Sequence, residues 1–133
     1  MTKYPSRNTG NYFPLPNEIF NLGLSTGEIS VYSYLMRCED RETFQCHPSY
    51  AAIGKAVKLS RNTVQKYVKS LEEKGLIITQ PTSVVTRTGI KRNGNLQYTI
   101  LPIEGAKQRY YERQVEENEV KLLQEKLKNL VTK

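Results

Sequence analysis

The apolar positions of the chain change their spacing near residue 75. Before it they recur every three or four residues, which is typical of amphipathic helices. This spacing predicts helices from about 26 to 37, from about 50 to 57 and from about 61 to 74. After residue 75, short β-branched and alternating runs are separated by Gly, Asn and Pro, which predicts strands instead.

Residues that begin and end helices stand at the edges of these periodic stretches. Ser25 and Glu28 form a capping-box pattern before the first helix. Ser49 and Ser60 are suitable N-cap residues for the second and third helices. Gly75 is the residue expected to stop the third helix.

The region 76–101 is expected to fold as a β-hairpin around a basic loop. Its tip, residues 86–95, contains turn-forming Gly and Asn and carries Arg87, Lys91 and Arg92 on what we expect to be a mobile loop. A hairpin in this position would extend from a three-helix core.

The chain divides into three parts on these patterns. Residues 1–13 are polar and expected to be a flexible segment. Residues 14–103 form the folded domain, and 104–133 form a helix. One short helical turn is expected at 17–22, with three apolar side chains pointing inward: Ile19, Phe20 and Leu22.

The predicted fold class is therefore α+β and mainly α. A three-helix core with a β-hairpin wing is a winged helix-turn-helix, here followed by a long C-terminal helix. In a helix-turn-helix the second helix of the pair reads base edges in the major groove of DNA.

The charge distribution agrees with a polyanionic partner. The whole chain carries a net charge of +7, and residues 50–103 alone carry +7. Residues 1–49 carry −1 and residues 104–133 carry +1. A basic segment between two nearly neutral ones is typical of a protein that binds a polyanion such as nucleic acid, and an ordinary solvated surface is the alternative.

Two groups of side chains are the candidate DNA contacts. Arg, Asn and Gln on the third helix suit base edges, Lys suits phosphates, and hydroxyls at helix N-termini suit phosphates as well. Basic side chains of a wing suit the adjacent minor groove. The candidate residues are Ser49, Tyr50, Ser60, Arg61, Asn62, Thr63, Gln65, Lys66, Lys69, Arg87, Lys91 and Arg92.

The stretch PSYAAIGKAVKLSRNTVQKYVKSLEEKGLI, residues 48–77, resembles the winged-helix domains of GntR-type regulators. The opening YFPLPNEIF, residues 12–20, with the capped helix at Ser25, is similar to small helix-turn-helix proteins and to the N-terminal domains of plasmid and phage replication initiators. The resemblance covers residues 12–101 and implies DNA binding. The family usually has Gly where this chain has Lys58 and Ala where it has Gly54. Gly54 should therefore weaken the second helix, and either Lys58 is strained in a left-handed conformation or the turn differs from that of the family.

The C-terminal helix carries an apolar stripe that predicts self-association. Its spacing is three, seven and ten residues, although it spans only about two heptads. The alternative is a helix packed on its own domain. A homodimer would meet a pseudo-palindromic site. The stripe consists of Val120, Leu123, Leu127 and Leu130.

Other classes of site find little support. Cys38, Cys46 and His47 are fewer than the four ligands usual for zinc, so no metal and no cofactor are expected. One His and no phosphate-binding Gly motif argue against an enzyme. No apolar run is long enough to span a membrane, and a cytoplasmic, nucleoid-associated location is expected.

Three functions follow from this interpretation. The first is a transcriptional regulator that acts by occupying its DNA site, without a small-molecule effector because no effector domain is evident. The second is a replication initiation or maintenance factor of a plasmid, phage or mobile element. The third is a protein-interaction adaptor, which the concentrated positive charge disfavours.

Overall fold

Four α-helices and two small antiparallel sheets form the part of the chain that the structure describes, residues 11–131. The structure is a computed structural model. Most of the segment expected to be flexible, residues 1–10, lies outside this range. The elements are η1 (Asn17–Asn21), α1 (Thr26–Cys38), β1 (Gln45–Cys46), α2 (Tyr50–Val57), α3 (Arg61–Glu73), β2 (Ile77–Gln80), β3 (Ser83–Val85), β4 (Lys91–Asn93), β5 (Gln97–Ile100) and α4 (Ile103–Val131).

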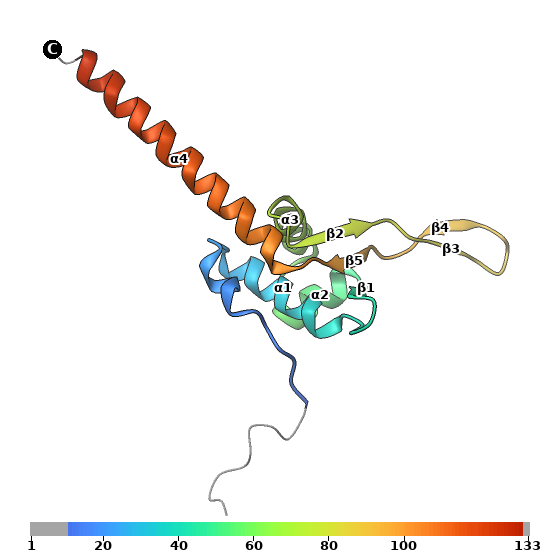
Figure 1. The fold of residues 1–133 in the computed structure, drawn as a ribbon. Helices are drawn as coiled ribbons and strands as arrows, with labels where there is room; N and C mark the ends of the chain where they lie inside the picture. The colour runs from blue at the N-terminus through green and yellow to red at the C-terminus, as the bar shows by residue number, and fades with distance from the viewer. Residues whose placement is uncertain (1–10, 132–133) are drawn as a thin grey trace, which may run out of the picture.

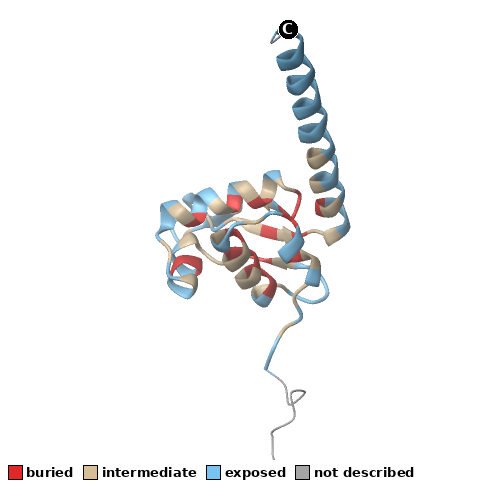
Figure 2. Ribbon diagram, turned by 90° about the vertical axis from the view of Figure 1, so that its left-hand side faces the viewer, coloured by how far each residue is buried: buried red, intermediate tan, exposed pale blue. Residues whose placement is uncertain are grey.

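The core lies where α1, α2 and α3 meet a three-stranded sheet (Figures 1 and 2). Each helix turns one apolar face toward it, as the spacing predicts. The largest fully buried side chains are Tyr32, Tyr98, Ile19, Leu35, Ile53, Leu71, Leu76, Ile77, Val31, Val64 and Val68. The winged helix-turn-helix fold predicted from the sequence is therefore confirmed.

The helix caps are formed as predicted. The Ser25 amide donates to Glu28 Oε1 at 3.0 Å, and the Glu28 amide donates to Ser25 Oγ at 3.3 Å. Ser49 and Ser60 each accept the amide three residues later, at 3.0 and 3.2 Å. Gly75 follows α3 with φ of +81°, in the left-handed region where a residue without Cβ is favoured.

The short turn before α1 differs from the prediction in one side chain. Ile19 and Leu22 are buried, but Phe20 is 68% exposed. Residues 17–21 form a 3-10 helix, in which side chains three positions apart lie on one face. Ile19 and Leu22 share that face, whereas Phe20 does not.

The strand region contains two sheets rather than one hairpin. β5 lies between β1 and β2 and is antiparallel to both. β1, which the sequence analysis missed, is only two residues long and pairs with Gln97–Ile100. β3 and β4 form a separate two-stranded ribbon that extends from this sheet (Figure 1).

Only the start of α4 is attached to the domain. Ala106 is buried, Tyr110 is half-buried against the core, and Arg109 Nη1 donates to the Glu73 carbonyl at 3.0 Å. Beyond these turns the helix projects away from the core and is exposed (Figures 1 and 2). The outer part of α4 is therefore not packed on its own domain. Within residues 11–131 no helix is both long and apolar enough to cross a membrane.

The turn between α2 and α3 depends on Gly54 and Lys58. Lys58 is left-handed, with φ of 62° and ψ of 45°, and its backbone amide donates to the Gly54 carbonyl. The tight turn brings the Leu59 carbonyl oxygen so close to Gly54 that an added Cβ would overlap with it. Gly54 is thus required by the turn, and the expectation that it merely weakens the helix is wrong.

This close approach predicts the sign of a substitution. Gly54→Ala should destabilise the protein by about 1–3 kcal/mol, because the new methyl group overpacks the turn. Helix propensity alone would predict a gain of about 0.5–1 kcal/mol. Urea unfolding followed by circular dichroism measures the difference.

Gly105 provides the matched control. It lies in α4, and an added Cβ would meet nothing within 4 Å. Gly105→Ala should therefore stabilise the protein by about 0.5–1 kcal/mol. A stabilising Gly54→Ala would contradict the proposed packing of the turn.

Candidate nucleic-acid interface

Helix α3 has one buried and one exposed face. Val64, Val68 and Leu71 are buried against α1 and α2, and Tyr67 is half-buried beside them. The opposite face carries polar and basic side chains with no acidic residue before the last turn. The exposed residues of that face are Arg61, Asn62, Gln65, Lys66 and Lys69.

The N-terminus of α3 presents two hydroxyl groups. The Thr63 amide donates to Ser60 Oγ at 3.2 Å, and the two hydroxyl oxygens are 2.8 Å apart. One hydroxyl donates to the other, so one of the two protons stays available for another acceptor. The unpaired backbone amides of the first turn add positive potential at the same place.

The two candidate hydroxyl-bearing residues at the start of α2 are less free than those at the start of α3. The Ser49 hydroxyl is occupied as the cap of Ala52, although its own proton is available. Tyr50 is half-buried. Burial and, to a smaller extent, the nearby Glu72 raise the pKa of the Tyr50 hydroxyl. The hydroxyl therefore stays protonated at neutral pH and can act as a donor.

Glu72 bridges α3 and β2. Its Oε1 accepts the backbone amide and the hydroxyl of Thr79, each at 2.9 Å. The C-terminal end of α3 is thereby held to the first strand of the sheet.

A buried ion pair sets the position of α3 against α1. Lys74 Nζ, just after α3, lies 2.8 Å from Glu28 Oε2 and 3.0 Å from Oε1. The Ser70 hydroxyl also donates to Oε2, at 2.8 Å. The Glu28 side chain is only 6% exposed. Burial raises the pKa of Glu28, but the donors Lys74, Ser25 and Ser70 together outweigh it and lower that pKa.

Two of the three basic wing residues lie on a strand rather than on a mobile loop. Val84 pairs with Arg92 and Val85 with Lys91 across the β3–β4 ribbon. Adjacent residues of a strand point to opposite faces, so Lys91 and Arg92 project from opposite sides of the ribbon. Arg87 lies in the turn beyond them. The sequence prediction placed all three on a loop, which is wrong for Lys91 and Arg92.

The wing turn is closed by its own hydrogen bonds. The Thr86 amide donates to the Ile90 carbonyl at 2.9 Å, and the Gly89 amide donates to the Thr86 carbonyl at 2.9 Å. The Ile90 amide donates to the Thr86 hydroxyl at 3.1 Å. This network fixes the turn that carries Arg87.

The base of the wing is tied to the segment before α2. The Gly94 amide donates to the Thr82 carbonyl at 2.8 Å, and the Thr82 hydroxyl donates to the Asn95 carbonyl. Asn95 Nδ2 donates to the His47 carbonyl at 3.3 Å. The ribbon is therefore connected to the helix pair and not only to the sheet.

The wing also exposes apolar side chains that the sequence analysis did not single out. Val84, Val85 and Ile90 are 54%, 71% and 54% exposed. Val84 and Val85 are adjacent on β3 and point to opposite faces, and both are exposed, so neither face of the ribbon is covered. Apolar wing residues suit sugar and base edges in a narrow groove.

The cysteine region shows no ligand arrangement. Cys38 and Cys46 are free thiols, and Cys46 Sγ donates to the Leu35 carbonyl at 3.6 Å. Burial raises the pKa of the Cys46 thiol to about 12. Among residues 11–131 no three His, Cys, Asp or Glu side chains are grouped to hold a metal ion.

A helix pair joined by a three-residue turn and followed by a β-ribbon defines a winged helix-turn-helix domain. In agreement, a family model described as a helix-turn-helix domain matches residues 22–77, from just before α1 to the start of β2. This family description is less specific than the two resemblances noted in the sequence, to GntR-type regulators and to replication initiators. No curated protein sequence matches the chain significantly.

Solved structures with related shape include two proteins named as regulators. A possible transcriptional regulator from Methanosarcina mazei Go1 is 22% identical with a TM-score of 0.48, covering 81% of this chain and 80% of its own. The adhesin competence repressor of Streptococcus pyogenes is 14% identical with a TM-score of 0.44, covering 82% of this chain and 72% of its own. At these scores the likeness does not decide the function of this chain.

The buried ion pair leads to a prediction for stability. Glu28→Ala should destabilise the protein by about 3–5 kcal/mol at pH 7, because it leaves the Lys74 ammonium without its buried partner. Since the native pKa is lowered from 4.5, this contribution is present above pH 4.5 and is lost as the pH falls below it. Urea unfolding at several pH values measures both effects.

Glu104→Ala is the control, because that carboxylate also pairs with a lysine but is 77% exposed. Its loss should cost less than about 1 kcal/mol. Equal costs for the two variants, or a Glu28→Ala cost that does not shrink in acid, would contradict the assigned role of Glu28.

Proposed function

We propose that the chain binds double-stranded DNA in a sequence-specific manner, with α3 in the major groove and the β3–β4 ribbon on the adjacent minor groove. The observation that carries this proposal is the division of α3 into a buried apolar face and an exposed face of Arg, Asn, Gln and Lys. A recognition helix needs the apolar face to pack on its own domain and the polar face to contact base edges.

The exposed face of α3 has the side chains that direct readout requires. Arg61, Asn62 and Gln65 lie in its N-terminal half, the part that reaches base edges. Arg pairs with guanine and Asn or Gln with adenine in bidentate geometry. Lys66 and Lys69 suit phosphates on either side of the groove.

Hydroxyl groups at the starts of both helices suit the DNA backbone. Ser60 and Thr63 have two hydroxyl protons, and only one of them is used in the hydrogen bond between the two side chains. The other can be donated to a phosphate, which the N-terminus of the helix also favours. Ser49 and Tyr50 offer a second, weaker pair of donors at the start of α2. These contacts fix the register of the protein on DNA without reading sequence.

The ribbon suits insertion with its edge toward the DNA. Lys91 and Arg92 project from opposite faces, so each would meet one of the two phosphate walls of the groove. Arg87 in the turn would reach deepest. The link from Asn95 to the His47 carbonyl holds this ribbon at a defined angle to the helix pair.

We also propose that residues 14–103 form the DNA-binding unit and that the outer part of α4 joins two copies of the chain. The stripe residues Val120, Leu123, Leu127 and Leu130 are 51–71% exposed. Burying such side chains against a second copy stabilises the pair by roughly 25 cal/mol for each Å² removed from water. The dimer would act as a transcriptional regulator by occupying a two-fold site.

Removing one arginine from each element should affect DNA binding differently. Duplexes selected from a random pool by the unmodified protein serve as ligands in a fluorescence anisotropy titration. Arg61→Ala should relax the preference at one base position by about 1–3 kcal/mol. Arg92→Ala should weaken binding to all duplexes alike. Because one phosphate contact is lost, the slope of log affinity against log salt should become shallower by about one.

Arg37→Ala removes the same charge from the exposed end of α1, outside both elements, and should change neither quantity. The proposal fails if Arg61→Ala and Arg92→Ala bind the selected duplexes as the unmodified protein does. If only Arg92→Ala leaves DNA binding unchanged, the proposed contact of the wing is wrong and that of α3 stands.

The oligomeric state tests the role of α4. Light scattering on a size-exclusion column should give a dimer at tens of micromolar, and Leu123→Glu should give a monomer because a charge enters the apolar contact. Lys121→Glu, a charge change beside the stripe, should leave the dimer intact. A monomeric unmodified protein would contradict the dimer.

A further inference from the structure

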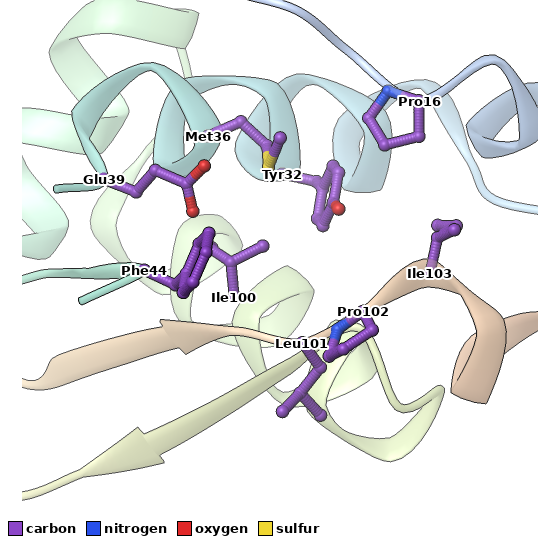
Figure 3. A pocket seen from close by; sticks show the side chains of 9 residues that line it. All are labelled: Pro16, Tyr32, Met36, Glu39, Phe44, Ile100, Leu101, Pro102 and Ile103. Carbon is purple, nitrogen blue, oxygen red and sulfur yellow. The ribbon is translucent and has the colours of Figure 1, made fainter. Parts of the chain in front are cut away.

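An apolar pocket lies beneath the point where α4 leaves the domain. Its volume is about 330 Å³, within the range of small-molecule sites. The walls come from α1, the end of β5, the loop before β1 and the first residue of α4 (Figure 3). The main apolar lining residues are Tyr32, Met36, Phe44, Ile100, Pro102 and Ile103.

One acidic side chain reaches into this apolar surrounding. Glu39 follows the last residue of α1, and its side chain is only 4% exposed. Figure 3 shows its carboxyl group directed toward the space between Met36 and Phe44. Oε2 is buried and has no hydrogen-bond partner among the described residues.

The nearest cation satisfies Glu39 only in part. Arg41 Nη1 lies 3.6 Å from Oε1, beyond hydrogen-bond distance, and its side chain is 53% exposed. Burial raises the pKa of Glu39, and Arg41 opposes this rise only partly. A buried carboxylate oxygen without a donor is costly, and native proteins seldom retain one without a reason.

The electrostatic surroundings favour a positive charge. Glu39 stands at the C-terminal end of α1, where the carbonyl groups of the last turn carry partial negative charge. Tyr32 and Phe44 present aromatic rings to the same space, and ring faces attract cations. Anionic ligands would be repelled by the same groups.

We propose that this pocket binds a small molecule that has an apolar body and a protonated amine. The ammonium group pairs with the Glu39 carboxylate, whose buried Oε2 is brought to the pocket by a rotation of the side chain, and the apolar body lies among Met36, Ile100 and Ile103. This occupant supplies the donor that the carboxylate lacks and covers the apolar walls. The sequence-based expectation of no effector assumed a separate effector domain, whereas this pocket lies within the winged domain itself.

The wall formed by Phe44 is held in a conformation that is unusual for an aromatic residue. Its φ is +61°, and its side chain is 54% exposed at the edge of the pocket. The Phe44 amide donates to the Asp40 carbonyl at 2.8 Å, and its carbonyl accepts the Ile100 amide at 2.9 Å. The backbone is therefore fixed on both sides, and a bound molecule would cover the exposed ring.

Three probes of similar size separate the amine from other ligands. Phenethylamine, 2-phenylethanol and 3-phenylpropionate are titrated into the full chain without DNA, and the methyl signals of Met36, Ile100 and Ile103 are followed by NMR. The amine should shift these signals in a saturable way, with an affinity at least about tenfold above that of the alcohol. The carboxylate should bind more weakly still.

Glu39→Gln keeps the shape of the side chain and should lower the affinity for the amine to that for the alcohol. Glu42→Gln, an exposed residue of the same loop, should leave the amine affinity unchanged. Equal binding of amine and alcohol to the unmodified protein would overturn the proposal, whether or not the Glu39 variant folds. So would unchanged amine binding by a folded Glu39→Gln variant, or the absence of any shift at millimolar amine.

Because these titrations use no DNA, their outcome is separate from that of the proposed DNA contacts. A negative result here would leave the interface of α3 and the wing untouched. A positive result would place a ligand against Pro102 and Ile103, where the domain joins the helix that carries the dimer stripe.

Discussion

The buried carboxylate of Glu28 is the contact on which the arrangement of the helices depends. It caps α1 through Ser25 and accepts from Ser70 and Lys74, so one side chain joins the start of the first helix to the C-terminal end of α3. Its four acceptor positions are nearly filled, which offsets the cost of burial. This network, together with the buried apolar face of α3, sets the orientation of α3 and of its exposed basic face.

Local chemistry made much of the fold predictable. Serine caps, a terminal glycine and helical spacing gave the helices of the core to within a residue or two, because those signals act over a few positions. Phe20 was misplaced since a 3-10 turn repeats every three residues, not every 3.6. Gly54 was misjudged because the Leu59 carbonyl approaches it only once Lys58 turns left-handed.

Which side chains of the candidate site are exposed could be predicted where the spacing along one helix decides it, but not where segments distant in the sequence meet. The exposed set on α3 followed from its spacing alone. Glu28 and Lys74 are 46 residues apart in the sequence, and no local sequence pattern predicts their pairing. The two-residue strand β1, the break that turns the hairpin into a separate ribbon, and the buried Glu39 likewise depend on tertiary contacts.

The central claim is that α3 and the wing together bind the phosphate backbone and bases of duplex DNA. The most direct measurement is the affinity of the full chain for a mixed-sequence duplex between about 50 and 200 mM salt. Five cations, Lys66, Lys69, Arg87, Lys91 and Arg92, predict a slope of log affinity against log salt of about −4 to −5. A flat response over that range would contradict the account.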